Sequence, residues 1–415
     1  MRLIRITTNY TAYLQKFYRD HSGLAEQPYA VQYRQLMDDC FGWADFWTRA
    51  FGQLGYEVWE PVGNAEPQQK AWAREQGIRY EESHWLTDIT AAQIKNFQPA
   101  VLFVNDYFTY TREFLDYVRG ECPSIQLIIG WCGAPYRDAS VFGAYDVVLS
   151  NISSLVEHFR AQGHHSEHLR HAFEPSILGK LLRDSLETVP FSFIGSIFKG
   201  EGLHNERERL LKHLAQNSSL QIWSDIQAPP IEEYQRLVDR KSRFVTARRI
   251  KRLWGGNSLL QVLPQFRGCL NESDEPDLSG YIDLEIVKRT KPGLYGLAMY
   301  QMLHDSQVTF NNHIDISSQL ANNMRLYEAT GVGACLLTDC KKNLVNIFEP
   351  DVEVVTYDSA QEAVAKARYL LAHDDERRRI AAAGQRRTLR DHTIGLRAQQ
   401  LNEIIKLALQ RGSSR

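Results

Sequence analysis

The sequence has no apolar run near the roughly 18 residues that a membrane-spanning helix needs. The segment that follows Met1 has the pattern of a short strand and lacks the apolar core of a signal peptide. Lysine and arginine total 48 against 50 aspartates and glutamates, so the formal charge is −2. A chain with this balance has no basic field that could hold nucleic acid. We therefore expect a cytoplasmic protein without a nucleic-acid partner.

Cysteine pairs at metal-binding spacing are also absent from the sequence. The six cysteines include no Cys-x-x-Cys pair, a usage typical of a reducing compartment. His164, His165, His168 and His171 include spacings of three and four residues, but no cysteine or suitably spaced carboxylate accompanies them. We therefore expect neither a metal site nor a cofactor.

The length of 415 residues suggests two domains of about 200 residues each. Short apolar and β-branched runs alternate with helix-length segments, a pattern that predicts parallel sheets with crossover helices and hence an α/β fold. The strands that we expect are 3–7, 56–60, 101–104, 125–129, 147–149, 191–194, 220–223, 308–310, 334–337 and 352–356.

Two of the expected helices have clear boundary signals, and a third has a clear apolar face. Residues 42–55 carry apolar side chains on one face and end at Gly55. Ser359 and Glu362 form a capping-box pattern at the start of another helix. The last helix, about 394–410, has apolar residues at helical spacing and needs a surface on which to dock.

Polar residues directly after the strands are the first candidates for a site, because open α/β sheets bind ligands beyond the carboxyl ends of their strands. The loop that starts with Gly195 and Ser196 contains Lys199, and Arg207 lies near the start of the next helix. Backbone amides, a helix N-terminus and two cations suit a phosphate or a diphosphate. The alternative is an ordinary strand-to-helix turn with an exposed lysine.

A second candidate segment, residues 322–339, joins a short helix to a strand through a glycine turn that includes Gly331. Arg325 and Glu328 lie one turn apart on this helix. A glutamate can accept two hydrogen bonds from the vicinal hydroxyls of ribose, while the arginine offsets diphosphate charge. The alternative is a surface ion pair that contributes only a few tenths of a kcal/mol.

The sequence resembles a known family, the CgeB-like (spore-maturation-type) glycosyltransferases. The segments that carry the resemblance are NMRLYEATGVGACLLTD, FEPDVEVVTYDS, RDHT, FSFIGS, GLYGLAMYQML and TFNNHID, with GWADFW, GWCGAP and HAFEP matching more loosely. The resemblance implies a GT-B architecture, in which two Rossmann-like domains face each other across a cleft. It also implies a metal-independent enzyme that moves a sugar from a nucleoside diphosphate sugar to a hydroxyl acceptor, such as a surface glycan.

The resemblance further implies how the chain is divided. Residues 1–180 would form the acceptor-side domain and residues 181–393 the donor-binding domain, with a hinge near 172–190. Residues 394–415 would form a terminal helix that returns to the N-terminal domain.

Site residues follow from the same resemblance. Glu328 matches the ribose-binding glutamate of retaining GT-B enzymes, but Leu320 stands where a second acid would be expected. The donor-binding set would comprise Gly195, Ser196, Lys199, Arg207, Asn311, Asn312, Asn323, Arg325, Glu328 and Gly331. Asp106 and His313 are the candidate catalytic residues, and a turn or capping role is the alternative for Asp106. His171 could contact the donor at the hinge.

Residues 236–252 are rich in arginine and lysine and include apolar side chains. A basic amphipathic helix can lie on anionic lipid, so this segment is a candidate for peripheral contact with the inner face of a membrane. A solvated helix face is the alternative. Two other functions stay open for the whole chain, a nucleotide-sugar epimerase or hydrolase on the same fold and a noncatalytic glycan-binding protein.

Overall fold

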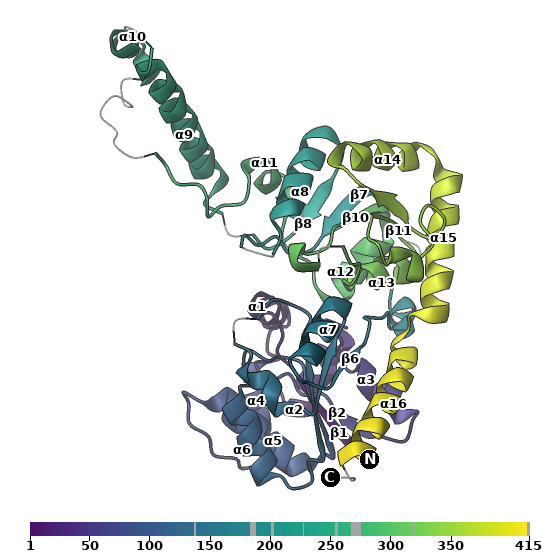
Figure 1. Cartoon of the computed structure of the whole chain (residues 1–415). Helices are drawn as coiled ribbons and strands as arrows, with labels where there is room; N and C mark the ends of the chain where they lie inside the picture. The colour runs from purple at the N-terminus through teal and green to yellow at the C-terminus, as the bar shows by residue number, and fades with distance from the viewer. Residues whose placement is uncertain are drawn as a thin grey trace.

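A computed structural model of the chain describes residues 1–136, 138–182, 188–200, 203–226, 228–253, 256–266, 275–317 and 319–412. Residues 183–187 of the expected hinge and residues 413–415 of the expected terminal segment lie outside the described residues. The chain forms two α/β domains that lie one above the other in Figure 1.

The N-terminal domain is a parallel six-stranded sheet with the order β2-β1-β3-β4-β5-β6. Its strands are β1 (Arg2–Ile6), β2 (Glu57–Trp59), β3 (Val101–Val104), β4 (Leu127–Trp131), β5 (Val147–Ser150) and β6 (Ser166–His168). Its helices are α1 (Thr11–Asp20), α2 (Tyr29–Asp38), α3 (Phe46–Gly52), α4 (Glu66–Glu75), α5 (Trp85–Phe97), α6 (Arg112–Glu121) and α7 (Ser153–Ala161).

Both faces of this sheet are covered, as the continuous apolar strands predict. Alternate residues point to opposite faces, so Leu3 and Ile4 belong to two different apolar clusters. The register of the central pair places Leu3 beside Val101 and Ile4 beside Leu102.

The C-terminal domain repeats this architecture with the strand order β12-β11-β10-β7-β8-β9. Its strands are β7 (Val189–Ile194), β8 (Gln221–Trp223), β9 (Thr290–Lys291), β10 (Ser306–Asn311), β11 (Cys335–Asp339) and β12 (Val355–Tyr357). Its helices are α8 (Asn205–Asn217), α9 (Ile231–Lys251), α10 (Gly256–Val262), α11 (Leu284–Val287), α12 (Gly296–His304), α13 (Arg325–Val332), α14 (Ala360–Ala372) and α15 (Asp374–Asp391).

The last helix, α16 (Ile394–Gly412), leaves the C-terminal domain and packs on α3 and β4 of the N-terminal domain. Figure 1 shows it running along that domain in yellow. The Tyr56 hydroxyl donates to Asn402 Oδ1 at 2.7 Å. The expectation of two parallel α/β domains with a terminal helix that crosses back is therefore confirmed.

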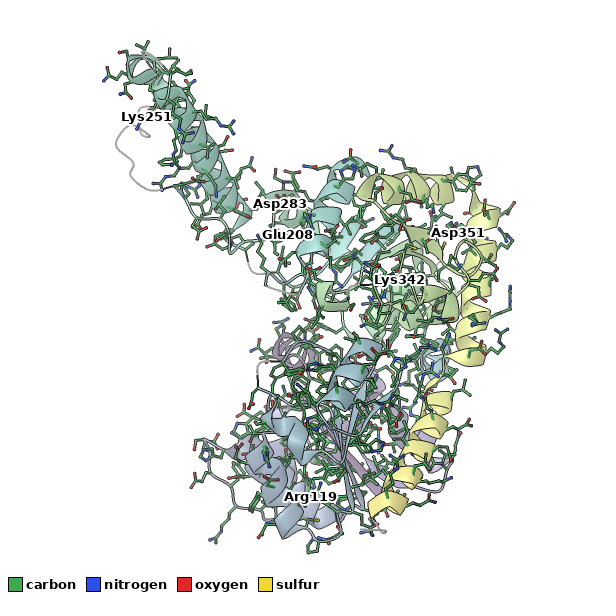
Figure 2. All side chains as sticks on the ribbon, viewed as in Figure 1. Arg119, Glu208, Lys251, Asp283, Lys342 and Asp351 are labelled. Atoms are coloured by element: carbon green, nitrogen blue, oxygen red, sulfur yellow. The ribbon has the colours of Figure 1, made fainter. Side chains whose placement is uncertain are left out.

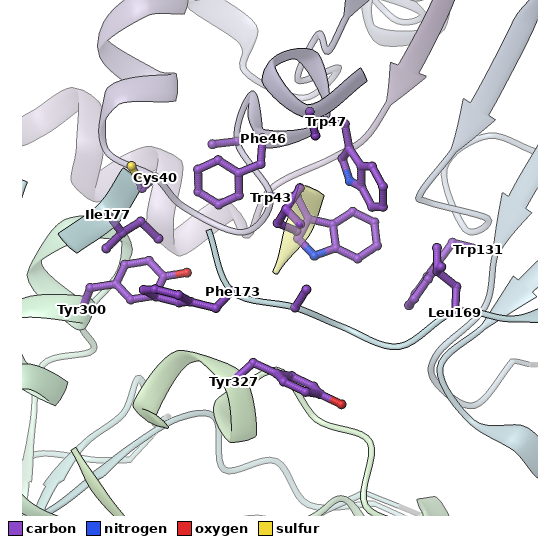
Figure 3. Packing of buried hydrophobic residues seen from close by; sticks show 14 of the residues in the cluster. Cys40, Trp43, Phe46, Trp47, Trp131, Leu169, Phe173, Ile177, Tyr300 and Tyr327 are labelled. Carbon is purple, nitrogen blue, oxygen red and sulfur yellow. The ribbon is translucent and has the colours of Figure 1, made fainter. Parts of the chain in front are cut away.

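Two segments of the chain connect the domains side by side. The Phe173 amide donates to the His392 carbonyl at 2.9 Å, and the Ile394 amide donates to the Phe173 carbonyl at 3.0 Å. Figure 3 shows Phe173 between Tyr300 and Tyr327 of the C-terminal domain and aromatic side chains of the N-terminal domain. The same apolar cluster continues through both domains, so the connection is packed on both sides.

One expected helix is shorter than its apolar pattern suggested. Residues 42–55 were expected to be helical throughout, but α3 begins only at Phe46. Cys40, Gly42 and Ala44 have positive φ angles of 58°, 62° and 39°, which a right-handed helix does not permit. The apolar spacing therefore extends past the point at which the backbone changes direction.

Two helices of the C-terminal domain form a projecting arm. Helix α9 extends away from both domains, and α10 packs against its far end (Figure 1). We call the described part of residues 231–266 the arm.

Candidate active site

A cleft of about 1130 Å³ lies between the two domains, at the carboxyl ends of strands from both sheets. This is the position at which open parallel sheets bind ligands. From the N-terminal domain the lining includes Arg5, Thr8, Asn9, Tyr10, Phe41, Trp43, Asn105, Trp131 and His171. From the C-terminal domain it includes Gly195, Ser196, Lys199, Arg207, Ser224, Asp225, Tyr295, Asn311, Asn323, Arg325 and Glu328.

The structure brings eight of the ten expected donor-binding residues to this cleft. They are Gly195, Ser196, Lys199, Arg207, Asn311, Asn323, Arg325 and Glu328. The other two, Asn312 and Gly331, do not belong to the described lining. The Asn312 carbonyl accepts a hydrogen bond from Arg207, and Gly331 packs against Phe173.

Glu328 stands on the first turn of α13, with its side chain 9% exposed. Arg325 Nη1 lies 2.9 Å from Glu328 Oε2. Burial and the nearby Glu328 carboxylate raise the pKa of Tyr300, which keeps that phenol protonated. Arg325 and Glu328 therefore form the ion pair that was the alternative interpretation of the sequence. The pair lies in the wall of the cleft and not on the outer surface.

Arg207 on α8 ties two loops of the rim together. Its Nη1 donates to the Ser196 carbonyl at 2.7 Å, and its Nη2 donates to the Asn312 carbonyl at 2.5 Å. Burial lowers the pKa of Arg207 to about 10, and the side chain stays charged at neutral pH. Both terminal nitrogens therefore hold backbone oxygens.

Lys199 is the more accessible of the two expected cations. Its side chain is 33% exposed, lines the cleft, and lies 3.4 Å from Glu208. An exposed ammonium of this kind can turn toward an anion at little cost, because its ion pair is worth about 1 kcal/mol or less.

The asparagines at the end of β10 and before α13 are held in fixed orientations. Asn323 Nδ2 donates to Asn311 Oδ1 at 2.7 Å, and Asn311 Nδ2 donates to Thr338 Oγ1 at 2.9 Å. Asn312 Nδ2 donates to Asp339 Oδ2 at 3.3 Å. The amides of this rim are therefore set before any ligand binds.

His313 lies behind the rim and outside the described lining of the cleft. Its Nδ1 lies 2.7 Å from Asp339 Oδ1, and Lys341 lies 3.1 Å from the same carboxyl group. Burial opposes the charge on Asp339, but His313 and Lys341 outweigh burial and lower the pKa of Asp339 to about 2. This arrangement anchors the ends of β10 and β11.

Asp106, the other candidate catalytic residue, accepts hydrogen bonds from the backbone of its own turn. Its Oδ1 accepts from the Phe108 and Thr109 amides at 2.9 and 3.1 Å, and Thr8 Oγ1 donates to its Oδ2 at 2.5 Å. Among the described residues that line the cleft, Thr8 and Asn105 are its neighbours, whereas Asp106 is set back. This geometry is that of the capping alternative.

Gly331 faces the hinge instead of the cleft. A Cβ atom at this position would lie 2.4 Å from Cγ of Phe173. Only glycine allows the helix to approach the connecting segment so closely.

The N-terminal wall of the cleft is aromatic and was largely missed by sequence reasoning. Trp43 contacts Trp131 edge to face, with ring centroids 4.9 Å apart, and the His171 ring lies 5.2 Å from that of Trp131. Figure 3 shows Trp43 and Trp131 in this region. The Arg5 guanidinium lies over Trp43 at 5.7 Å and forms a buried ion pair with Glu60. This wall is therefore close to neutral overall.

Three buried polar atoms of this wall have no hydrogen-bond partner among the described residues. They are Trp43 Nε1, Asn105 Oδ1 and His171 Nδ1. Burial, and to a lesser extent Arg397, lowers the pKa of His171 to about 3, so the imidazole is neutral at physiological pH. The sequence singled out His171, in the HAFEP segment, as a donor contact at the hinge, and the structure places it beside Trp131 in the N-terminal wall. Trp43 was assigned only to a helix face.

Among the residues that the structure describes, no group of three histidine, cysteine or acidic side chains could hold a metal ion. His168 Nε2 lies 3.3 Å from the Asn151 carbonyl, and His165 lies 3.3 Å from Glu167. Across the described ranges, no helix is both long and apolar enough to cross a bilayer.

Comparisons with known proteins agree with this architecture. Residues 207–403, slightly less than half of the chain, match the family described as glycosyl transferase-like. A search of curated proteins gave no match.

Solved structures match over nearly the full chain. Sucrose-phosphate synthase from Thermosynechococcus elongatus matches with a TM-score of 0.53 and 10% identity, covering 99% of this chain and 100% of that one. HepE of Anabaena in complex with UDP-glucose matches with a TM-score of 0.52 and 10% identity, covering 98% and 99%. A glycosyltransferase from Rickettsia africae matches with a TM-score of 0.51 and 9% identity, covering 98% of each chain. These likenesses establish the GT-B fold.

Proposed function

Since the chain has the GT-B fold and residues 207–403 match a glycosyl transferase-like family, we propose that it is a glycosyltransferase whose two substrates bind to opposite walls of the cleft. A nucleoside diphosphate sugar binds to the C-terminal wall, and a hydroxyl-bearing sugar acceptor binds to the N-terminal wall. The structure of HepE with UDP-glucose supports a donor of this class, because the two chains share their fold over nearly their whole length.

The position of Glu328 is the observation that carries the donor assignment. Its carboxylate is buried beside the cleft, where it can accept hydrogen bonds from both ribose hydroxyls. Arg325 holds the carboxylate in place and adds a positive charge to the same wall. Lys199 and the backbone amides of the Gly195–Ser196 loop then face the diphosphate.

Arg207 acts in this proposal as a positioning residue. Because its guanidinium holds the Ser196 and Asn312 carbonyls, it fixes the spacing between the loops that follow β7 and β10. Its charge also favours the leaving nucleoside diphosphate through space, since electrostatic interactions are stronger in a site that excludes water. Asn311 and Asn323 present preset amides to the donor sugar.

The acceptor side consists of flat rings and unpaired polar atoms. Trp43 and Trp131 line the cleft but are each only 7% exposed, so they form an apolar floor beneath the acceptor. Trp43 Nε1, Asn105 Oδ1 and His171 Nδ1 retain unused hydrogen-bonding capacity just beneath the surface. A wall of this kind suits an uncharged acceptor that carries many hydroxyl groups.

Asp106 and His313 support this arrangement from behind the cleft wall. Asp106 shapes the turn that presents Asn105, and His313 anchors Asp339 below the donor loops. We propose that transfer proceeds without a metal ion or another cofactor, and that the chain belongs to the CgeB-like group within GT-B enzymes. The membrane contact expected through residues 236–252 is a separate proposal, because it depends on a surface outside the cleft.

A matched pair of variants tests the donor site. Glu328→Gln removes the charge of an i,i+3 ion pair in the cleft, and Glu403→Gln does the same to the exposed Glu403–Lys406 pair on α16. Each protein is titrated calorimetrically with uridine, guanosine and adenosine diphosphates. We expect Glu328→Gln to weaken binding of the preferred nucleotide about 10- to 100-fold, since the glutamine oxygen still accepts from one ribose hydroxyl and one hydrogen bond to a charged group, worth about 1.5–3 kcal/mol, is lost.

Glu403→Gln is expected to bind like the wild type. Equal affinity of Glu328→Gln and the wild type would refute the donor site. Incubation of a labelled nucleotide-sugar without an acceptor tests the reaction: formation of an epimer, or hydrolysis as fast as transfer, would refute the proposed chemistry.

A further inference from the structure

The arm formed by α9 and α10 has few contacts with the rest of the chain. Its 21-residue helix α9 is about 30 Å long at 1.5 Å per residue. At the far end, Ala247 and Leu260 are buried between α9 and α10, with Ile250 and Phe266 beside them. This small cluster holds α10 against α9, while the outer surface of both helices faces solvent (Figure 1).

The far half of the arm carries charge of one sign. Residues 240–266 contain seven lysines and arginines and no acidic residue. Four of the seven, Arg248, Arg249, Lys251 and Arg252, are exposed at the end of α9. We call these four residues the tip cluster, and Figure 2 shows Lys251 at this end of the arm. Glu275, on the returning chain, lies 3.9 Å from Arg248 and 3.4 Å from Lys241, so it offsets part of this positive charge.

Exposed apolar side chains lie next to the tip cluster. Leu253, Leu259 and Val262 are 64%, 50% and 72% exposed, and all three fall within ten consecutive positions of the sequence. Single exposed apolar residues are common on protein surfaces, but a group of them beside a cluster of cations is not. Cations interleaved with exposed leucine and valine are typical of helices that bind at a lipid surface, where the cations meet phosphates and the apolar groups enter the acyl boundary.

The base of the arm is part of the cleft. Ile226 precedes α9, Gly280 and Ile282 follow the arm, and all three line the cleft between the domains. The arm therefore projects from the rim of the cleft on the side of the C-terminal domain.

We propose that the tip of the arm docks on an anionic phospholipid bilayer and holds the cleft next to an acceptor carried by that bilayer. The acceptor part of this inference rests on the proposed function, whereas docking itself does not. Charge complementarity favours this occupant over a second copy, because two tips with the same positive charge repel each other in a symmetric contact. The exposed Leu253, Leu259 and Val262 favour a bilayer over nucleic acid, which would leave them in water.

Sedimentation of the full chain with vesicles tests the proposal. One set contains equal parts of phosphatidylglycerol and phosphatidylcholine, and the other contains phosphatidylcholine alone. The tip variant is Arg248→Glu/Arg249→Glu/Arg252→Glu. The matched control, Arg378→Glu/Arg379→Glu/Arg386→Glu, makes the same change of charge at exposed positions on α15.

We expect the wild type and the α15 variant to bind the anionic vesicles and to release them as salt rises. Each cation near an anionic surface strengthens binding about fivefold, so loss of three is expected to weaken the tip variant at least about 100-fold. Leu259→Gln/Val262→Gln is expected to weaken binding at low salt although all cations are still present, because it removes the apolar contribution.

The proposal is overturned if the wild type does not bind anionic vesicles, or if the tip variant binds them as well as the α15 variant does. It is also overturned if the tip variant only converts a dimer into a monomer, or only releases nucleic acid. Nucleotide titration of the tip variant keeps the two proposals apart. Normal nucleotide binding with lost vesicle binding supports docking, and a wild type that binds vesicles but no nucleotide would overturn the donor site alone.

Discussion

Replacement of Arg207 by methionine separates positioning of the site from stability of the fold. Methionine fills a similar volume but cannot donate to the Ser196 and Asn312 carbonyls. Loss of two hydrogen bonds from a charged donor costs about 3–6 kcal/mol. Against this, burial lowers the pKa of Arg207 to about 10, so the fold disfavours its charge. The difference from the ordinary pKa of arginine corresponds to about 3 kcal/mol that methionine recovers.

These two effects largely offset each other, so the free energy of unfolding of Arg207→Met should lie within about 2–3 kcal/mol of the wild-type value. The loops after β7 and β10 lose their connection, and nucleotide affinity should fall at least about tenfold, or about 1.4 kcal/mol. Urea unfolding measures the free energy of unfolding, and calorimetry measures the nucleotide affinity.

Arg209→Met is the control on the same helix, because the Arg209 side chain is 77% exposed and pairs only at the surface with Glu206. Arg209→Met should change neither the free energy of unfolding nor the free energy of nucleotide binding by more than about 0.5 kcal/mol. Unchanged nucleotide affinity in Arg207→Met would refute the positioning role. A loss of stability well above about 4 kcal/mol would refute the balance between hydrogen bonding and burial.

Two further predictions concern the hinge and the response to acid. Gly331→Ala places a methyl group against the Phe173 ring and should lower the free energy of unfolding by about 1–3 kcal/mol; an unchanged melting temperature would show that the hinge contact is loose. Burial lowers the pKa of His171 to about 3 and that of His392 to about 4, while both take up a proton near a pH of about 6.5 in the unfolded chain. Stability should therefore be complete above a pH of about 6.5 and fall by about 1.4 kcal/mol per pH unit for each histidine as the pH drops toward about 4. His171→Phe should make this slope shallower in urea unfolding at a series of pH values, and equal slopes for both proteins would contradict the assignment.

The central strands could be predicted because each is a short apolar run between helix-length segments. Strand β3 has the expected bounds, and the other expected strands lie within a few residues of their apolar runs. Prediction worked here because burial on both faces of a parallel sheet leaves a continuous apolar signal. Strands β6 and β9 were not expected, since they lie at the sheet edges and consist of polar residues, SEH and TK.

The start of α3 could not be predicted in the same way. The apolar spacing of residues 42–55 is helical, but the left-handed backbone at Cys40 and Ala44 depends on tertiary contacts. Arg5 Nη2 donates to the Ala44 carbonyl at 2.8 Å, and the two residues are 39 positions apart in the sequence. This turn places Trp43 in the cleft. Because the turn depends on a contact between distant residues, the aromatic wall could not be predicted from the local sequence.

The sequence predicted where the candidate site lies better than it predicted which residues contact each other there. Residues after the strands do meet at one cleft, as the topology of parallel sheets requires. The pattern could not show that Arg207 holds two carbonyls, or that His313 turns inward to Asp339. The Arg207–Asn312 contact joins residues 105 positions apart and the His313–Asp339 contact joins residues 26 positions apart. Local spacing carries no information about either.

The most direct test of the donor site is a crystal structure of the full chain with its preferred nucleoside diphosphate. We expect both ribose hydroxyls within about 3 Å of the Glu328 carboxylate, with the diphosphate beside Lys199 and the Gly195–Ser196 loop. A nucleotide bound elsewhere, or one whose ribose is turned away from Glu328, would contradict the proposed donor site.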